Sequence, residues 1–140
     1  NNSAVLQDDD KLFFAIVANT AYEFTIDLWW KSTAAADMKV AITVPSGAVL
    51  MCHTIAGYDE SSTVIYRASW TSGGVIGGSG VNGRLDCSDS PSDQVMTTVR
   101  GIVLNGANAG NVQLQWAQYV ATAVDTKVLA YSHIIYRKLV

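Results

Sequence analysis

YEFTIDLWWKSTAAADMKVAITVP, residues 22–45, contains two stretches in which hydrophobic and polar residues alternate with a period of two. In residues 22–31, one set of alternating positions is hydrophobic and the other is mostly polar: Tyr22, Phe24, Ile26, Leu28 and Trp30 against Glu23, Thr25, Asp27, Trp29 and Lys31. A helix would scatter the hydrophobic set around its circumference, whereas a strand places it on one face. Residues 38–44 repeat the pattern, so we predict two strands of a half-buried antiparallel sheet.

The rest of the chain consists of short hydrophobic runs between turn residues, with no sustained helical period. Pro45-Ser46-Gly47 and Asn105-Gly106 are examples of such turns. We predict strands at residues 4–7, 11–17, 22–31, 38–44, 49–55, 63–70, 94–104, 112–120 and 126–137. Strands at this spacing predict an all-β protein, a sandwich or barrel of about eight to nine antiparallel strands.

The chain is predicted to form a single domain over residues 1–140, because this is a common domain length and no second unit or repeat is apparent. Residues 1–10 are predicted as an N-terminal arm. Residues 71–93 are rich in Gly, Ser and other polar residues and are predicted as a long loop region. Loops of that length usually carry function, so we expect partner contact there. Residues 32–37 are the one segment where a helical turn is expected.

Composition narrows the classes of partner. Hydrophobic residues make up 49% of the chain and charged residues only 15%, which predicts that other subunits cover part of the surface. The net charge is -3 and the basic residues never form a run, which argues against nucleic acid as a binding partner. The longest uncharged run, residues 101–124, contains six amide side chains that lipid would desolvate, so no membrane partner is predicted. No signal peptide is recognised at the start.

Two motifs could suggest a ligand or a metal. Gly78, Gly80 and Gly83 have the G-x-G-x-x-G spacing, but no helical pattern follows to meet a pyrophosphate, so no cofactor is predicted. Asp8, Asp9 and Asp10 could contribute to a calcium site. Adjacent side chains of an extended segment point to opposite sides, so we favour a solvated turn and predict no metal.

Catalysis is not predicted. His53 and His133 are the only imidazoles, and neighbours in a strand face opposite ways, which separates Cys52 from His53. Two buried, inert thiols are favoured over a disulfide between Cys52 and Cys87.

The tryptophans divide into two groups. Trp30 and Trp116 are in phase with hydrophobic neighbours and are predicted to lie in the core. Trp29 lies on the polar face beside Asp27 and Lys31, so it is expected to meet another subunit, another sheet or a ligand. Contact with another subunit is the favoured interpretation.

Four segments, in this order, resemble a family of small β-sandwich virion proteins of tailed bacteriophages: LQDDDKLFFAIVANTAYEF at 6–24, AAADMKVAITVPSG at 34–47, AGNVQLQWAQ at 109–118 and VLAYSHIIYRKL at 128–139. In that family an L-Q-x-D-D-x-L segment precedes an alternating strand, and an A-A-A-D-x-K turn leads to a strand ending in P-x-G. An A-G-x-x-x-L-x-W-A-Q strand then precedes a last strand ending in Arg. The resemblance covers residues 6–47 and 101–137 and leaves the centre unmatched.

The resemblance implies a jelly-roll-like homotrimer on the virion. We predict a capsid decoration protein on the capsid exterior, which binds and stabilises the lattice of the major capsid protein. The alternative is a tail-fibre or receptor-binding head domain that recognises a host-surface glycan. Decoration is favoured because no stalk precedes the domain and no polar and aromatic cluster for sugar is evident. Subunit or partner contact is expected at Trp29, Asp8, Asp9, Asp10, Val75 and Ile76.

Overall fold

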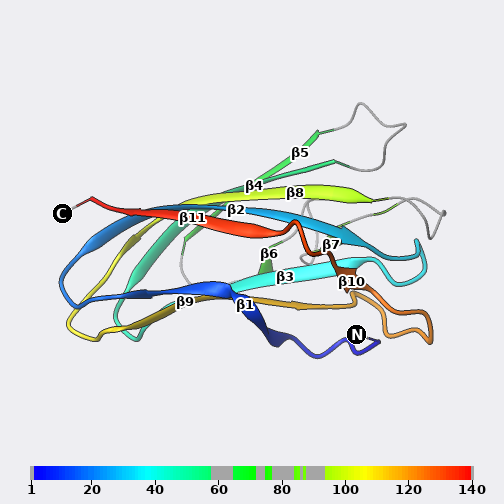
Figure 1. Cartoon of the computed structure of the whole chain (residues 1–140), viewed down its shortest axis with the longest axis horizontal. Coiled ribbons are helices and arrows are strands. Elements are labelled where there is room, and N and C mark those ends of the chain that lie inside the picture. The colour runs from blue at the N-terminus through cyan, green and yellow to red at the C-terminus, as the bar shows by residue number, and fades with distance from the viewer. Residues whose placement is uncertain are drawn as a thin grey trace.

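The chain folds into two antiparallel β-sheets packed face to face, as Figure 1 shows for the computed structural model. The structure describes residues 2–57, 65–71, 75–76, 84–85, 87 and 94–139. Its strands are β1 Gln7–Ile16, β2 Ala21–Lys31, β3 Met38–Thr43, β4 Val49–Gly57, β5 Ile65–Thr71, β6 Val75–Ile76, β7 Arg84–Leu85, β8 Val95–Leu104, β9 Gly110–Ala117, β10 Lys127–Val128 and β11 His133–Lys138. No helix occurs in these ranges.

The strand order is that of a jelly roll. The five-stranded sheet has the order β1-β9-β3-β6, with β7 also paired to β3. The six-stranded sheet has the order β10-β2-β8-β4-β5, with β11 also paired to β2. The chain crosses from one sheet to the other between β1, β2, β3 and β4, and again between β8 and β9, as expected for two Greek keys. Eight strands have six residues or more, so the predicted all-β sandwich is confirmed.

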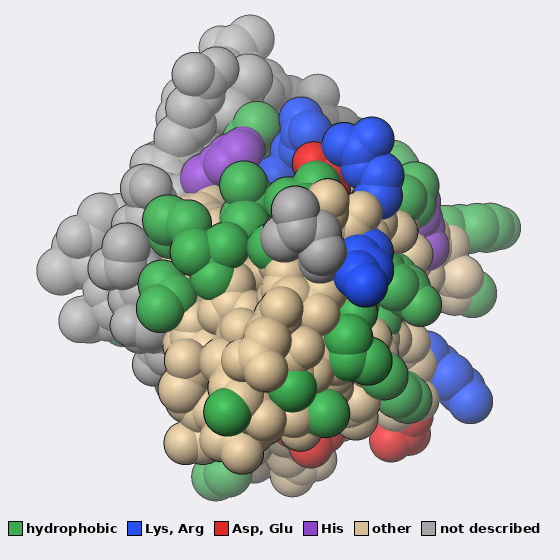
Figure 2. Space-filling view, turned by 90° about the vertical axis from the view of Figure 1, so that its left-hand side faces the viewer, with side chains coloured by type: hydrophobic (Ala, Val, Ile, Leu, Met, Phe, Trp, Pro, Cys, Tyr) green, Lys and Arg blue, Asp and Glu red, His purple; other side chains and the backbone are tan. Residues whose placement is uncertain are grey.

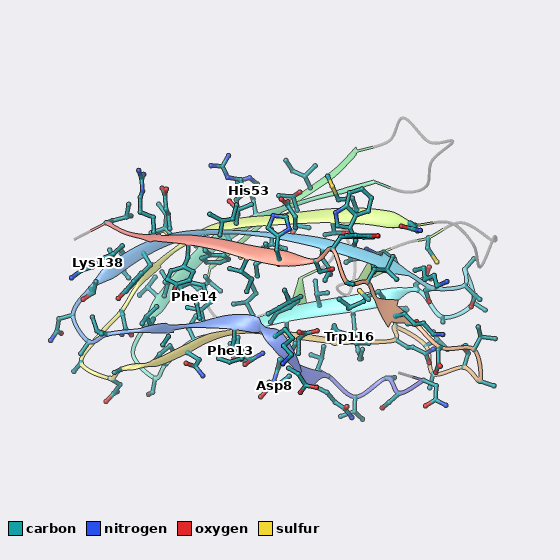
Figure 3. The ribbon with its side chains drawn as sticks, viewed as in Figure 1. Asp8, Phe13, Phe14, His53, Trp116 and Lys138 are labelled. Carbon is teal, nitrogen blue, oxygen red and sulfur yellow. The ribbon has the colours of Figure 1, made fainter. Side chains whose placement is uncertain are left out.

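The core lies between the sheets because the period-two patterns direct hydrophobic side chains inward from both. In β2 every second residue from Tyr22 to Trp30 is buried, as predicted. The Trp30 indole is fully buried, and its Nε1 donates to Thr97 Oγ1 at 3.0 Å, so its one polar atom is satisfied. Phe14 of β1 lies between the layers (Figure 3) and contacts Phe24 with ring centroids 5.8 Å apart. The predicted core position of Trp116 is only partly correct, because this side chain is half-buried and packs against the core edge.

The strand predictions need three corrections. Residues 4–7 are not a separate strand, because only Gln7 is extended and it begins β1. The strand predicted at 112–120 ends at Ala117, because the buried Gln118 amide bonds the loop that follows, with Nε2 2.6 Å from Val124 O. The strand predicted at 126–137 is broken by a turn in which Ser132 N donates to Leu129 O, so it becomes β10 and β11. Both pair with β2.

The predicted arm is shorter than residues 1–10. Gln7 and Asp8 pair with Trp116 and Gln115 of β9, so the arm ends where β1 begins. Even before β1 the segment is attached, because Gln118 N donates to Ser3 O at 2.9 Å. The arm is therefore part of the edge of the five-stranded sheet.

The segment at 32–37 forms a single turn and not a helix. Asp37 N donates to Thr33 O at 2.8 Å, and Asp37 then adopts a positive φ of 49°, which ends the turn. The loop predicted at 71–93 lies largely outside the described residues. Within it, β6 and β7 each pair with β3.

Candidate functional site

The candidate site is the outer face of the six-stranded sheet, which is the face directed away from the core. The same alternation that buries half of β2 directs Glu23, Thr25, Asp27 and Trp29 outward. On β8 the residues opposite these four are Ile102, Arg100, Thr98 and Met96. The outward face is therefore formed by rows of side chains that run across β11, β2, β8 and β4.

This face exposes more large hydrophobic side chains than a solvated sheet needs. Six of them point outward from β4, β8 and β11, and each is between 38% and 64% exposed: Val49, Met51, Met96, Ile102, Leu104 and Ile135. Several are cross-strand neighbours, because Val49 pairs with Leu104 and Met51 with Ile102. Clustered hydrophobic groups of this kind mark surfaces that contact other molecules.

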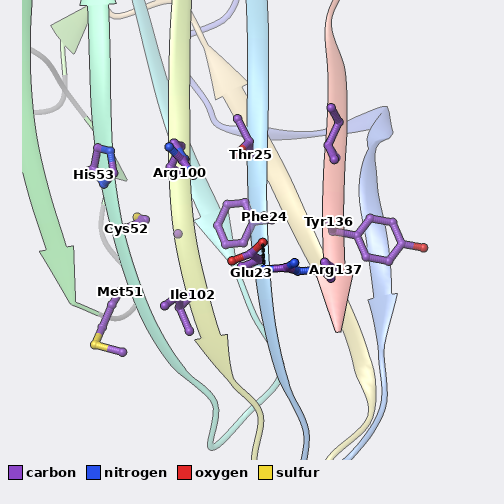
Figure 4. A pocket seen from close by; sticks show the side chains of 12 residues that line it. Glu23, Phe24, Thr25, Met51, Cys52, His53, Arg100, Ile102, Tyr136 and Arg137 are labelled. Atoms are coloured by element: carbon purple, nitrogen blue, oxygen red, sulfur yellow. Dashed lines mark ion pairs between the residues drawn. The ribbon is translucent and has the colours of Figure 1, made fainter. Parts of the chain in front are cut away.

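A hollow of about 370 Å³ lies in the middle of the face (Figure 4). Its outward-pointing walls come from four strands: Met51 and His53, Arg100 and Ile102, Glu23 and Thr25, and Ile135 and Arg137. The floor is tightly packed. A Cβ added to Gly101 would lie 2.7 Å from Phe24 Cζ and 2.8 Å from Cys52 Cβ, so the bare glycine lets the Phe24 ring fill the space beneath the hollow.

The charges around the hollow are unevenly compensated. Arg137 Nη2 lies 2.8 Å from Glu23 Oε1, and His133 Nε2 lies 3.5 Å from Asp27 Oδ2. Arg100 is exposed and forms no ion pair among the residues that the structure describes, and the residue opposite it on β4 is His53. Figure 2, which looks along the sandwich from one end, shows basic side chains and a histidine gathered on the six-stranded side. Among the described residues Arg100 is thus a positive charge without an ion-pair partner, flanked across the sheet by His53 and Thr25.

Trp29 lies on this face beyond the hollow, as its position on the polar face of β2 predicted. Its side chain is half-buried, and Met96 is its cross-strand neighbour. Its backbone is held by the segment before β11, because Trp29 N donates to Ser132 Oγ at 2.9 Å and Leu129 N donates to Trp29 O at 2.8 Å. The fold therefore explains part of the burial of Trp29, and its contact with a partner stays a prediction.

The three aspartates lie on β1 in the other sheet and have separate roles. The predicted solvated turn is a bulged strand, because the pairing of β1 with β9 shifts between Asp8 and Phe13. Asp9 Oδ1 accepts from the backbone N–H groups of Lys11 and Leu12, both at 2.9 Å, and Asp9 Oδ2 accepts from Trp116 Nε1 at 3.0 Å. Asp9 is therefore committed to holding the bulge, whereas Asp8 and Asp10 are exposed.

The positions of the acidic residues, cysteines and histidines bear on metal ligation and nucleophilic chemistry. The described part of the chain contains no group of three or more His, Cys, Asp or Glu residues that could hold a metal ion. Cys52 faces the core while His53 faces outward, as predicted, and Cys52 and Cys87 are both buried and are not joined by a disulfide. Burial raises the pKa of the Cys52 thiol to about 11, which disfavours the reactive thiolate.

The expected contact residues do not form one site. Val75 and Ile76 form β6, whose backbone pairs with Ala41 and Val40 in the five-stranded sheet, and their side chains lie outside the described residues. Trp29 belongs to the six-stranded sheet. Sequence reasoning missed the hollow and Arg100. The available signal was in β8, where Met96, Ile102 and Leu104 are hydrophobic at positions that should be solvated.

Comparisons with known proteins identify no relative of this chain. No family model, curated protein or solved structure matches this chain. Among the described residues, no helix has the length and hydrophobicity needed to cross a membrane.

Proposed function

We propose that this chain is a bacteriophage virion structural protein, a homotrimeric capsid decoration protein that binds and stabilises the lattice of the major capsid protein. The observation that carries the proposal is the outer face of the six-stranded sheet, with its six exposed hydrophobic side chains. A face of this composition is suited to being covered by protein. The proposal that the chain belongs to a virion comes from the resemblance of the four sequence segments to tailed-phage virion proteins.

Decoration requires two kinds of contact, one between copies and one with the capsid. The hydrophobic face supports contact between copies, because burying hydrophobic surface drives association. Linking three copies raises the effective concentration of each capsid-binding surface, so that individually weak contacts give durable attachment. The arm at residues 2–6 and the region at 71–93 are the proposed capsid contacts.

The alternative function, a tail-fibre or receptor-binding head domain that recognises a host glycan, is favoured by one observation. The hollow combines polar groups with hydrophobic walls, and its 370 Å³ lies within the range of small-ligand sites. Sugar sites commonly stack an aromatic ring on the ligand. The aromatic ring at this rim, Tyr136, already stacks on Phe14, with centroids 4.3 Å apart and planes 13° apart. Because Phe14 already covers one side of the Tyr136 ring, the glycan function is the second candidate.

The two functions are separated by offering purified chain to undecorated capsids and to host cells in parallel. Saturable binding to capsids with no binding to cells is expected. Capsids that already carry their decoration protein serve as the control for site-specific binding. Binding to cells alone would overturn the decoration proposal, and a single-chain mass by light scattering at micromolar concentration would overturn the trimer.

The role of the hydrophobic face is tested by a matched pair of variants. Ile135→Asp places a charge on the face at a residue that is 64% exposed, and Val17→Asp makes a similar change at a residue that is 53% exposed outside the face. Ile135→Asp should reduce both trimer formation and capsid occupancy, because a charge must be desolvated when the face is covered. Val17→Asp should leave both unchanged. Equal behaviour of the two variants would contradict a role for the face.

A further inference from the structure

We infer that the hollow of the six-stranded sheet receives the Asp8 carboxylate and the Phe13 ring of a second copy of this chain. The inference rests on the proposed function, because it names the partner of the same face. The ligand class is an acidic side chain beside an aromatic ring, presented by a β-strand.

The hollow has the chemistry of an acceptor for such a pair. Met51 and Ile102 provide hydrophobic walls and are 41% and 38% exposed. Arg100 provides a guanidinium that has no ion-pair partner among the described residues, while Glu23 on the same face is already paired with Arg137. The Arg100 guanidinium lies in the same hollow as the Met51 and Ile102 side chains, and a guanidinium can bind a carboxylate through two parallel charge-assisted hydrogen bonds.

The bulge in β1 creates the matching donor. Asp8 pairs with Gln115 and Phe13 pairs with Gln113, two positions apart on the same side of β9. Because successive side chains of a strand alternate, residues opposite Gln113 and Gln115 lie next to each other on the outer face of the five-stranded sheet. The bulge therefore places a carboxylate beside a ring that is five positions away in sequence, as Figure 3 shows for Asp8 and Phe13 on the lower layer.

The donor is exposed and held in place. Phe13 is 44% exposed opposite Gln113 of β9, and Asp8 is exposed and accepts a hydrogen bond from Gln115 Nε2 at 2.8 Å. The three hydrogen bonds accepted by Asp9 fix the bulge between them. Little ordering is then required when the pair docks, which favours association.

The two surfaces belong to different sheets, so the contact between copies is head-to-tail. Each copy offers a donor from the outer face of one sheet and an acceptor on the outer face of the other. Contacts of this kind are heterologous, and they form a closed ring when the rotation between copies closes. The proposed trimer requires that this rotation closes, and an open series of larger species in sedimentation would overturn the ring.

The test is charge reversal in the full-length chain, measured by sedimentation over a concentration series. Arg100→Glu and Asp8→Arg should each weaken self-association by about 30-fold or more, since each opposes like charges across the contact. The double variant Asp8→Arg with Arg100→Glu restores opposite charges and should recover most of the association. Lys127→Glu, a charge reversal at an exposed residue outside the hollow, is the control and should associate like the unchanged chain.

Circular dichroism melts of all four variants separate loss of contact from loss of fold. Self-association of either single variant at the level of the unchanged chain overturns the inference, as does a folded double variant that fails to recover. Capsid binding is measured on the same samples. If self-association responds to the charge reversals as expected but the assembled chain does not bind capsids, the decoration function is overturned and the contact between copies stands. If the chain binds capsids as a monomer, the contact between copies is overturned and the decoration function stands.

Discussion

The two outer faces of the sandwich follow the same alternation and present different surfaces. On the five-stranded sheet, β9 directs Gln113 and Gln115 outward, and both amides bond to β1, to Asp9 O at 2.9 Å and Asp8 Oδ1 at 2.8 Å. On the six-stranded sheet the outward positions carry six exposed hydrophobic side chains around a hollow. One fold supports both faces, so the difference reflects what each face meets. We infer that the amide face meets mainly water and the hydrophobic face meets protein.

Phe13 differs from the amides of the five-stranded face, and this difference strengthens the comparison. Phe13 is a large exposed ring among polar side chains, located where β1 bulges beside Asp8. A single exposed ring needs no partner of its own. The Phe13 ring lies beside the exposed Asp8 carboxylate, and the hollow on the opposite face contains Arg100, which has no ion-pair partner among the described residues. The two surfaces are therefore complementary.

The largest expected effect compares one glycine from each sheet. Gly101→Ala in β8 should cost about 3 kcal/mol of the free energy of unfolding, because the new Cβ would lie within 2.9 Å of Phe24, Cys52 and the Met51 carbonyl. Gly110→Ala in β9 meets only the Pro45 ring, at 3.0 and 3.5 Å, and should cost about 1 kcal/mol. Denaturant unfolding measures both. Equal costs would show that the floor of the hollow can adjust.

The next effect concerns the side-chain hydrogen bonds that organise the five-stranded face. Asp9→Ala should cost about 2 kcal/mol of unfolding free energy, because two backbone N–H groups and the Trp116 indole lose their acceptor. Asp10→Ala is the matched control, since Asp10 is exposed, and its effect should be below about 0.5 kcal/mol. Chemical denaturation of both variants measures the two changes in unfolding free energy. A small cost for Asp9→Ala would mean that the pairing with β9 holds the bulge by itself.

A third prediction compares the hydrophobic face with a residue outside both outer faces. Ile135→Asp on the hydrophobic face should weaken self-association by tenfold or more, which corresponds to about 1.4 kcal/mol. Val124→Asp adds the same charge at a residue that is 52% exposed in the loop between β9 and β10 and should have little effect. The readout is the dissociation constant from sedimentation. Similar constants for both variants would contradict a role for the hydrophobic face in self-association.

The last effect is confined to high pH and comes from the thiol beneath the hollow. Burial raises the pKa of Cys52 from 9.0 to about 11, so the folded chain keeps this proton at pH values where the unfolded chain loses it. The stabilising contribution is therefore complete below pH 9 and is lost as the pH rises towards about 11. Stability should fall less steeply over this window in Cys52→Ala than in the unchanged chain. Parallel curves would contradict the raised pKa.

Much of the fold was predictable because it depends on local alternation. The period of two in residues 22–31 identifies β2 and assigns Trp30 to the core, and both predictions are confirmed. The break between β10 and β11 was missed because Ser132 N bonds back to Leu129 O in a segment with continuous strand-like hydrophobicity. The position of this turn depends on the register in which β10 and β11 each pair with β2, and the sequence of the segment alone does not specify that register.

The candidate site was less predictable because it depends on register. Arg100 lies between His53 and Thr25 only because β8 pairs with β4 and β2 in one particular register, which follows from the whole sheet. The bulge that joins Asp8 to Phe13 likewise requires the pairing with β9. The signal in the sequence was the hydrophobic residues at outward positions of β8, a pattern that is typical of strands buried on both faces of their sheet.

The most direct test of the covered face uses the three methionines of the chain as internal probes. Met51 and Met96 are 41% and 44% exposed on the hydrophobic face, and Met38 is fully buried in the core. Oxidation by hydroxyl radicals, read by peptide mass spectrometry, is compared between assembled or capsid-bound protein and dilute single chains. The account predicts protection of Met51 and Met96 upon assembly and low oxidation of Met38 throughout. Equal oxidation of Met51 and Met96 in the assembled and single-chain states would contradict it.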